Sequence, residues 1–137
     1  MKVNIYLMFE GRAGEAFRFY ERVLGAKVGE VFTYGNSPGA EQSSPEWRDK
    51  VMHGSFTVGD AVVMASDAPP QHFQPPQGFS VSLTVSDPAE AEKLFRGLSE
   101  NARSITMPLQ QTFWSPKFGM LVDQFGIPWM VNCAQPA

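Results

Sequence analysis

Apolar and polar positions follow two kinds of pattern along this chain, and the patterns come in the same order twice. Residues 3–9 form a β-rich apolar run, and residues 15–25 carry apolar side chains at helical spacing up to Gly25, a residue well suited to end a helix. Strand-like runs follow at 27–34, 50–58 and 61–67. The first half therefore predicts the order strand–helix–strand–strand–strand, with a flexible loop at 35–47 and a short turn at Gly59–Asp60.

The second half repeats this order. A strand-like run at 78–87 ends at Asp87, and Asp87, Pro88 and Glu90 are typical of a helix start, here of a helix over 89–100. Further strands are predicted at 104–109, within 110–123 and at 126–133. Residues 110–130 should form a hairpin in which Gly119 and Gly126 allow tight bends and Trp114 and Trp129 close the sheet.

Two modules of this kind cannot each bury a sheet face alone. We therefore predict an α+β fold in which two tandem βαβββ modules form a cupped eight-stranded mixed sheet with the helices outside. The first module covers about 1–67, a Pro-rich linker about 68–78, and the second module about 79–137, together making one domain over 1–137. The concave interior of such a sheet is the expected place for a small-molecule ligand.

The chain resembles the vicinal oxygen chelate superfamily, which contains glyoxalases, extradiol dioxygenases and bleomycin-resistance proteins, and within it the PhnB-like branch. The resemblance is carried by the segments YLMFEGRAGEAFRFYERVLGAKV, VMHGSFTVGDAVVMASD and MPLQQTFWSPKFGMLVDQFGIPWMVN. The chain departs from the family pattern at Ser115–Pro116, where relatives have Gly, and at 100–103, a segment that is Gly-rich in relatives. Both departures lie in predicted turns. The resemblance implies the fold predicted above and a homodimer.

The resemblance also implies one divalent metal held by His and Glu side chains from the first and last strand of each module. The corresponding positions in this chain lie near Ile5, Met64 or Ser66, Ser80 and Met130, and none is His, Asp or Glu. We therefore predict no metal site and no cofactor. The alternative is a metal held by relocated ligands such as His53, Asp67 and Asp123.

Four residues are candidates for ligand binding. His53 lies in a predicted strand, where it is either a polar anchor or general base, or a hydrogen-bonded core histidine. Asp67 and Asp123 end strands, where each is either a polar pocket group or a turn residue that accepts from backbone N–H groups. Trp114 is either a stacking surface for a planar ligand or a residue that fills the core or a dimer seam. No catalytic residue is identified.

Composition narrows the class of partner. The 11 Lys and Arg residues are scattered singly and the net charge is −3, which argues against nucleic-acid or membrane binding. Cys133 is the only cysteine, so no disulfide can form within the chain. No apolar run is long enough for a signal peptide or a membrane span, so we expect a soluble cytoplasmic protein.

Three functions remain open from the sequence. The first is a glyoxalase-like protein with a metal-free pocket for a small, partly aromatic or apolar molecule. The second is a metal-dependent lyase, isomerase or dioxygenase with noncanonical ligands, and the third is a protein that sequesters a drug or metabolite without turnover. Relatives of this branch are often described as methyltransferases of the ubiquinone pathway. The residues do not support that activity, because GRAGEAF lacks the glycine spacing of a nucleotide-binding turn. Whether the protein is an enzyme is left open.

Overall fold

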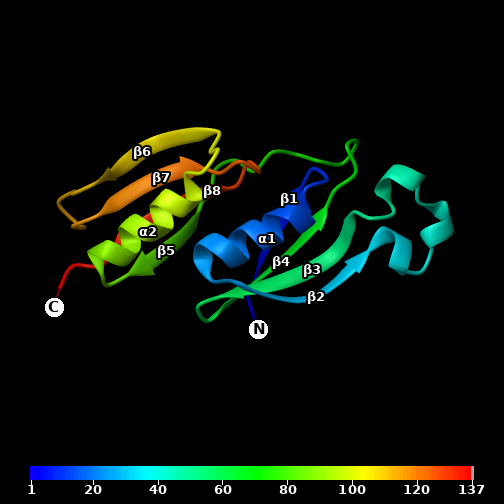
Figure 1. Ribbon diagram of the computed structural model, residues 1–137, viewed down its shortest axis with the longest axis horizontal. Helices are drawn as coiled ribbons and strands as arrows, with labels where there is room; N and C mark the ends of the chain where they lie inside the picture. The colour runs from blue at the N-terminus through cyan, green and yellow to red at the C-terminus, as the bar shows by residue number, and fades with distance from the viewer. Residues whose placement is uncertain (137) are drawn as a thin grey trace. The chain divides into compact units, whose positions relative to one another are not determined.

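The computed structural model describes residues 1–136, and it divides into two compact units that are described separately below. The first unit comprises Met1–Pro75 and the second begins at Pro76, so the boundary falls inside the predicted linker. Each unit contains one α-helix and one sheet (Figure 1).

The first unit has the order predicted from its sequence. Its elements are β1 (Ile5–Phe9), α1 (Ala13–Leu24), β2 (Lys27–Thr33), β3 (Val51–Val58) and β4 (Ala61–Asp67). They form a four-stranded sheet in the order β1-β4-β3-β2, in which β1 runs parallel to β4 and the other neighbours are antiparallel. Helix α1 lies across one face of this sheet (Figure 1).

The second unit repeats that topology. Its elements are β5 (Val81–Val85), α2 (Pro88–Leu98), β6 (Ser104–Gln110), β7 (Phe118–Val122) and β8 (Pro128–Cys133). The sheet order is β5-β8-β7-β6, with β5 parallel to β8, and α2 lies across one face. The predicted pair of βαβββ modules with mixed sheets is therefore confirmed, each module forming its own four-stranded sheet within the described residues.

Helix α1 packs its apolar stripe onto its own sheet. Phe17 and Tyr20 are buried and contact Phe56 of β3, with ring centroids 5.6 and 5.4 Å from that ring. Burying a side chain of this size stabilises the fold by about 1.5–3 kcal/mol. Gly54 makes room for the helix, because a Cβ added there would lie 2.8 Å from Phe17 Cε2.

The second unit uses a glycine in the same way, which corrects one expectation. Gly126 has a φ of +93° and forms the predicted tight bend. Gly119 instead lies buried within β7, where an added Cβ would be 2.6 Å from Phe95 Cε2. Gly119 is thus required by the close approach of α2, and no bend occurs at it. Trp129 is a core residue with 1% of its surface exposed.

The two helices begin in different ways. Asp87 is the N-cap of α2 and accepts a hydrogen bond from Ala89 N at 3.0 Å, as predicted. Helix α1 starts at Ala13, two residues before the predicted start, and its N-cap Arg12 makes no capping hydrogen bond through its side chain. The cap comes instead from Asp67, whose Oδ1 accepts from Ala13 N at 2.9 Å. Gly25 ends α1 with a φ of +67°, as predicted.

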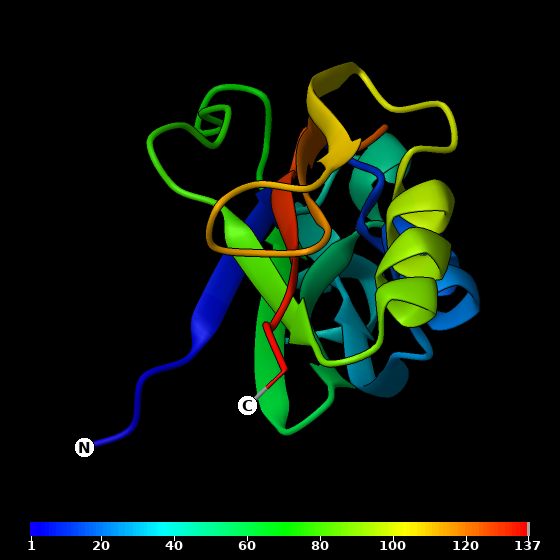
Figure 2. The same ribbon diagram turned by 90° about the vertical axis from the view of Figure 1, so that its left-hand side faces the viewer.

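The connecting segments carry short ordered pieces. The predicted loop at 35–47 contains three 3₁₀ turns, at Tyr34–Asn36, Ala40–Gln42 and Pro45–Trp47. In Figure 2 the residues before β1 project away from the first sheet, and the segment between β6 and β7 forms a wide loop. Within residues 1–136, neither helix has the length and apolar character needed to cross a membrane.

Candidate functional site

The face of the first sheet turned away from α1 is called here the open face. Leu7 and Phe9 of β1 point toward the helix and are buried, so alternation places Tyr6 and Met8 on the open face, where they are 43% and 45% exposed. Phe32 of β2 is 44% exposed and pairs in register with His53. The open face therefore presents aromatic and thioether surface around one histidine.

A polar cluster of Tyr6, His53 and Ser66 lies in the middle of this face. Tyr6 Oη is 3.3 Å from His53 Nδ1 and donates to Ser66 Oγ at 3.2 Å, and Ser66 Oγ donates to Met8 Sδ at 3.4 Å. The Tyr6 and His53 rings also contact each other, with centroids 5.9 Å apart. Three neighbouring strands, β1, β4 and β3, supply these side chains.

The order of donors favours one tautomer of His53. With Ser66 Oγ donating to Met8 Sδ and Tyr6 Oη donating to Ser66 Oγ, Tyr6 Oη can accept a hydrogen bond from His53 Nδ1. This arrangement favours the neutral tautomer with hydrogen on Nδ1, in which Nε2 holds the free lone pair. Nε2 has no hydrogen-bond partner within residues 1–136, so it is available to accept a proton or hydrogen bond from a ligand.

The residues at the positions where the resemblance implies metal ligands do not fit a metal ion. Ile5 pairs with buried Val63, so β1 presents Tyr6 and Met8 to the open face, one residue from the expected position. On the sheet faces turned away from the helices, the relevant strands carry Tyr6, Met8, Met64, Ser66, Ser82, Thr84, Met130 and Asn132. None of these is the His, Asp or Glu that divalent metals prefer. The described residues contain no group of three or more His, Cys, Asp and Glu side chains that could hold a metal.

Asp67 lies inside the first unit and serves its backbone. Its side chain is 1% exposed, and its carboxylate accepts from the backbone N–H groups of Gly11, Ala13 and Val51, each at 2.9 Å. It thereby joins the end of β4 to the start of α1 and of β3. It also borders a cavity of about 280 Å³ at the start of α1, whose charged lining residues include Arg12, Arg18 and Lys50.

Asp123 of the second unit also accepts from N–H groups, but within its own turn. It is fully buried, and its Oδ1 accepts from Phe125 N at 2.8 Å and Ile127 N at 3.0 Å. Its Oδ2 accepts from the indole N–H of Trp129 at 2.8 Å. Asp123 thus accepts within a turn and Asp67 accepts from distant segments, and a ligand-binding role for either stays a prediction.

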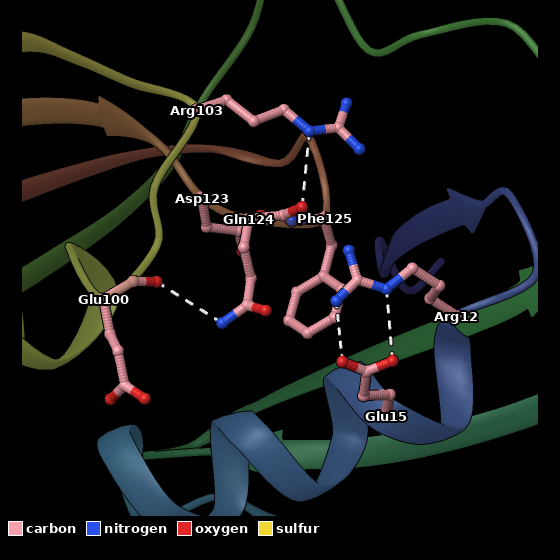
Figure 3. A network of polar contacts seen from close by, with 7 residues as sticks. All are labelled: Arg12, Glu15, Glu100, Arg103, Asp123, Gln124 and Phe125. Atoms are coloured by element: carbon pink, nitrogen blue, oxygen red, sulfur yellow. Dashed lines mark hydrogen bonds and ion pairs between the residues drawn. The ribbon is translucent and has the colours of Figure 1, made fainter.

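Two further hydrogen bonds hold the turn that follows Asp123 (Figure 3). Arg103 Nε donates to Gln124 O and Gln124 Nε2 donates to Glu100 O, each at 3.3 Å.

In the first unit, Arg12 Nη2 lies 2.6 Å from Glu15 Oε2, and this hydrogen bond lowers the pKa of Glu15. Both groups are about half exposed, so the pair contributes little to stability.

Trp114 lies on a loop of the second unit and is 45% exposed. It stands edge-on to Phe113 and Phe118, with ring centroids 4.8 and 5.3 Å away. The neighbouring Ser115 is fully buried and its Oγ donates to Cys133 O at 2.7 Å, which fastens the loop to the end of β8. The departure from the family pattern at this position thus gives a tethered loop that holds an aromatic surface outward.

The residue that sequence reasoning missed in this unit is Asn132. It pairs in register with Phe118 on one side and Thr84 on the other. Its Oδ1 is buried and has no hydrogen-bond partner within residues 1–136. An unpartnered buried acceptor is costly, which makes it a candidate for a ligand donor or an ordered water. No local sequence pattern distinguishes this asparagine from an ordinary strand residue.

Comparison with known proteins decides the family. A family model described as 3-demethylubiquinone-9 3-methyltransferase matches residues 1–132. The chain belongs to this family. It is 32% identical over 140 residues to protein YjdN of Escherichia coli (strain K12), a match that covers 96% of this chain and 95% of that protein. The PhnB-like resemblance expected from the sequence is therefore confirmed.

Solved structures agree with this assignment. Protein PA1353 from Pseudomonas aeruginosa is 42% identical with a TM-score of 0.88, and the match covers 99% of each chain. A PhnB protein from Bacillus cereus is 28% identical with a TM-score of 0.83, covering 98% of this chain and 100% of that one. A glyoxylase/bleomycin resistance protein/dioxygenase domain from Frankia sp. EAN1pec is 13% identical with a TM-score of 0.68 and covers 98% of both chains, which shows the shared fold alone.

Proposed function

We propose that this protein binds a small, partly aromatic or apolar molecule on the open face of the first sheet. His53 Nε2 would be the polar anchor of the site, accepting a hydrogen bond or a proton from the ligand. The observation that carries the proposal is the hydrogen-bond order through Tyr6 and Ser66, which leaves that nitrogen free. Exposed Met8 and Phe32 supply the apolar surroundings that a small-molecule site needs.

The proposed site needs no metal, because the binding groups are an imidazole, a phenol and apolar side chains. A lyase, isomerase or dioxygenase using relocated ligands would need His53 to converge with carboxylates. The His53 ring contacts the ring and hydroxyl of Tyr6, while the Asp67 carboxylate accepts from three backbone N–H groups. The site could therefore support general acid–base chemistry through His53 or binding without turnover.

The first experiment tests the tautomer without any ligand. A ¹H–¹⁵N spectrum of the His53 ring at pH 8 should show a protonated Nδ1 and a bare Nε2. In Tyr6→Phe the acceptor for Nδ1–H is gone, so the ring should revert toward the tautomer with hydrogen on Nε2. A wild-type ring that already carries its hydrogen on Nε2 would overturn the proposed anchor.

The second experiment tests binding with a matched pair of probes. 4-Cyanophenol offers an O–H donor, and its methyl ether, 4-methoxybenzonitrile, has the same ring without the donor. We expect the phenol to bind several-fold more tightly, because each good hydrogen bond contributes about 0.5–1.5 kcal/mol. His53→Ala should abolish that preference, and Trp114→Phe in the second unit should leave it unchanged. Equal affinities for the two probes in the wild-type protein would contradict the proposal.

We also propose that the protein forms a homodimer through the aromatic loop of the second unit. Phe113 is 91% exposed and packs on Trp114, and exposed apolar side chains of this size commonly mark an interface. Light scattering after gel filtration should give a dimer mass for the wild-type protein and a monomer mass for Phe113→Ser. A monomeric wild-type protein at micromolar concentration would refute this.

Methyl transfer, which the family description names, is not part of the proposal. Residues 10–16 lack the glycine spacing that cradles a nucleotide cofactor, and the sheet order is not that of a doubly wound fold. Calorimetric titration with S-adenosylmethionine should therefore give no binding heat. Saturable binding in that titration would restore the methyltransferase interpretation.

A further inference from the structure

A second concave surface lies in the first unit, between the 3₁₀ turns and the segment after β4. It has a volume of about 410 Å³, and its lining residues are Tyr34, Ser43, Ser44, Trp47, Pro69 and Gln71. This volume falls in the range of about 300–1,000 Å³ that is usual for small-molecule sites. It is called here the Trp47 pocket.

Two aromatic rings form one corner of the Trp47 pocket. Tyr34 and Trp47 meet edge to face, with centroids 5.9 Å apart and an interplanar angle of 89°. Tyr34 Oη is occupied, because it donates to Asp67 O at 2.8 Å. Trp47 is half-buried, so part of its ring is left for contact with a ligand. Aromatic rings prefer to meet other flat rings in offset-stacked or edge-to-face arrangements.

The remaining polar groups of the pocket are neutral and unengaged. Among the described groups of the chain, which leave out the side chain of Gln42, the hydroxyls of Ser43 and Ser44, the amide of Gln71 and the indole N–H of Trp47 have no hydrogen-bond partner. Together they offer both donors and acceptors. None of the six lining residues is charged, and burial of Tyr34 raises the pKa of its phenol above the ordinary value, so the phenol stays neutral at physiological pH.

Backbone hydrogen bonds hold the segments around the pocket. Tyr34 N donates to Lys50 O at 3.0 Å and Gly35 N to Arg48 O at 2.8 Å, which closes the base of the loop. Gly35 is needed there, because an added Cβ would lie 2.8 Å from Arg48 O. On the opposite wall, Phe73 N donates to Pro69 O at 3.0 Å. Segments held by such hydrogen bonds lose less conformational freedom when a ligand binds, which favours small ligands.

We propose that the Trp47 pocket is a second binding site, for an uncharged planar heteroaromatic ring that carries an amide or amino group. The ring would lie against Trp47, and its substituent would exchange hydrogen bonds with the serine hydroxyls and the Gln71 amide. A charged ligand would lose its hydration without gaining an opposite charge from the lining residues. The site is separate from the His53 cluster and does not depend on the function proposed for it.

Nicotinamide and nicotinate test this proposal as a matched pair, since they differ in charge and hardly in shape. The readout is the ¹H–¹⁵N signal of the Trp47 indole, identified by its absence in Trp47→Phe. Nicotinamide should shift this signal with a Kd on the order of 1 mM, as befits so small a ligand. Nicotinate should bind at least about tenfold more weakly.

Variants then locate the binding. Trp47→Ala should weaken nicotinamide at least about tenfold, measured on the Ser43 and Ser44 amide signals, and its thermal midpoint confirms that it is folded. Trp114→Phe is the control that removes a tryptophan elsewhere, and His53→Ala is the control for the other site. Both should leave the nicotinamide affinity unchanged. The proposal would be overturned if nicotinate bound as tightly as nicotinamide or if nicotinamide left the Trp47 signal unmoved. It would also be overturned if the pocket bound methyl α-glucoside, an uncharged molecule without an aromatic ring, instead of nicotinamide.

Discussion

Replacing Asp123 tests the structural role that the fold gives to this carboxylate. Three buried N–H groups depend on it, those of Phe125, Ile127 and the Trp129 indole. Asp123→Ala would leave all three without this acceptor, and each buried unsatisfied group costs about 1–3 kcal/mol. Since the turn can relax, we expect a loss of about 3–5 kcal/mol in the free energy of unfolding.

Asp123→Asn gives a sharper version of the same test. The amide oxygen can still accept from the two backbone groups, but the NH₂ group then faces the indole N–H of Trp129 as a second donor. We expect a loss of about 2–3 kcal/mol. In Asp123→Asn combined with Trp129→Phe the opposing donor is absent, so the double variant should lose at least about 1 kcal/mol less than the sum of the two single changes.

Urea and thermal unfolding, followed by far-ultraviolet circular dichroism, measure these differences. For a chain of this size a loss of about 3–5 kcal/mol lowers the melting temperature by roughly 10–20 °C. Asp60→Asn, at an exposed turn, is the control and should stay within about 0.5 kcal/mol of the wild type. If Asp123→Asn were as stable as the wild type, or if the double variant were additive, the carboxylate would not be structural. Its role as a ligand group would then be the better explanation.

Three further predictions follow from other parts of the molecule. Gly119→Ala should cost about 1–3 kcal/mol because its Cβ meets Phe95, and Phe95→Leu in the same chain should recover part of that loss in urea unfolding. Burial, followed by the nearby Asp67 charge, raises the pKa of Tyr34 above 10.0. The unfolded chain therefore loses this proton at a lower pH than the folded chain does, so the free energy of unfolding should fall as the pH rises above about 10. The Tyr34→Phe variant lacks this proton, so its free energy of unfolding should fall less over the same pH range. Chelator-treated protein should melt within about 1 °C of the same temperature with or without Mn²⁺, Ni²⁺, Zn²⁺ or Fe²⁺. A rise on the order of 10 °C, as expected for saturating metal, would refute the metal-free site.

The fold could be predicted from the sequence because local patterns carry most of it. Helical spacing in 15–25 and 89–100, and the strand runs around them, gave the element order of both units. The packing role of Gly119 could not be predicted in this way. A glycine in a strand predicts either a bend or a close approach, and only the position of Phe95 on α2 decides between them.

The candidate site was predicted only in part, for a topological reason. His53 was a candidate because it lies on a strand, but its partners come from β1 and β4. Those strands become neighbours through parallel pairing of distant segments, and no local pattern contains that information. The tautomer of His53 also depends on the contact between Ser66 and Met8, which lie on two different strands, so no local sequence pattern predicts it.

The two helix starts show how far local reasoning reaches. Met8–Ser66 and Phe9–Asp67 in the first sheet occupy the register positions of Thr84–Asn132 and Val85–Cys133 in the second. The second unit thus has Cys133 where the first has Asp67, and it supplies its own cap from Asp87 at the start of α2. The first unit lacks a local cap and uses the distant aspartate instead.

The sheet faces turned away from the helices also differ at matched positions. Ser66 in the first sheet completes a hydrogen-bonded cluster, while the Oδ1 atom of its counterpart Asn132 has no hydrogen-bond partner in the part of the chain that the structure describes. Duplicated backbones with divergent side chains at matched positions should bind different chemical groups, so a ligand that engages His53 is not expected to be recognised in the same way by the second unit.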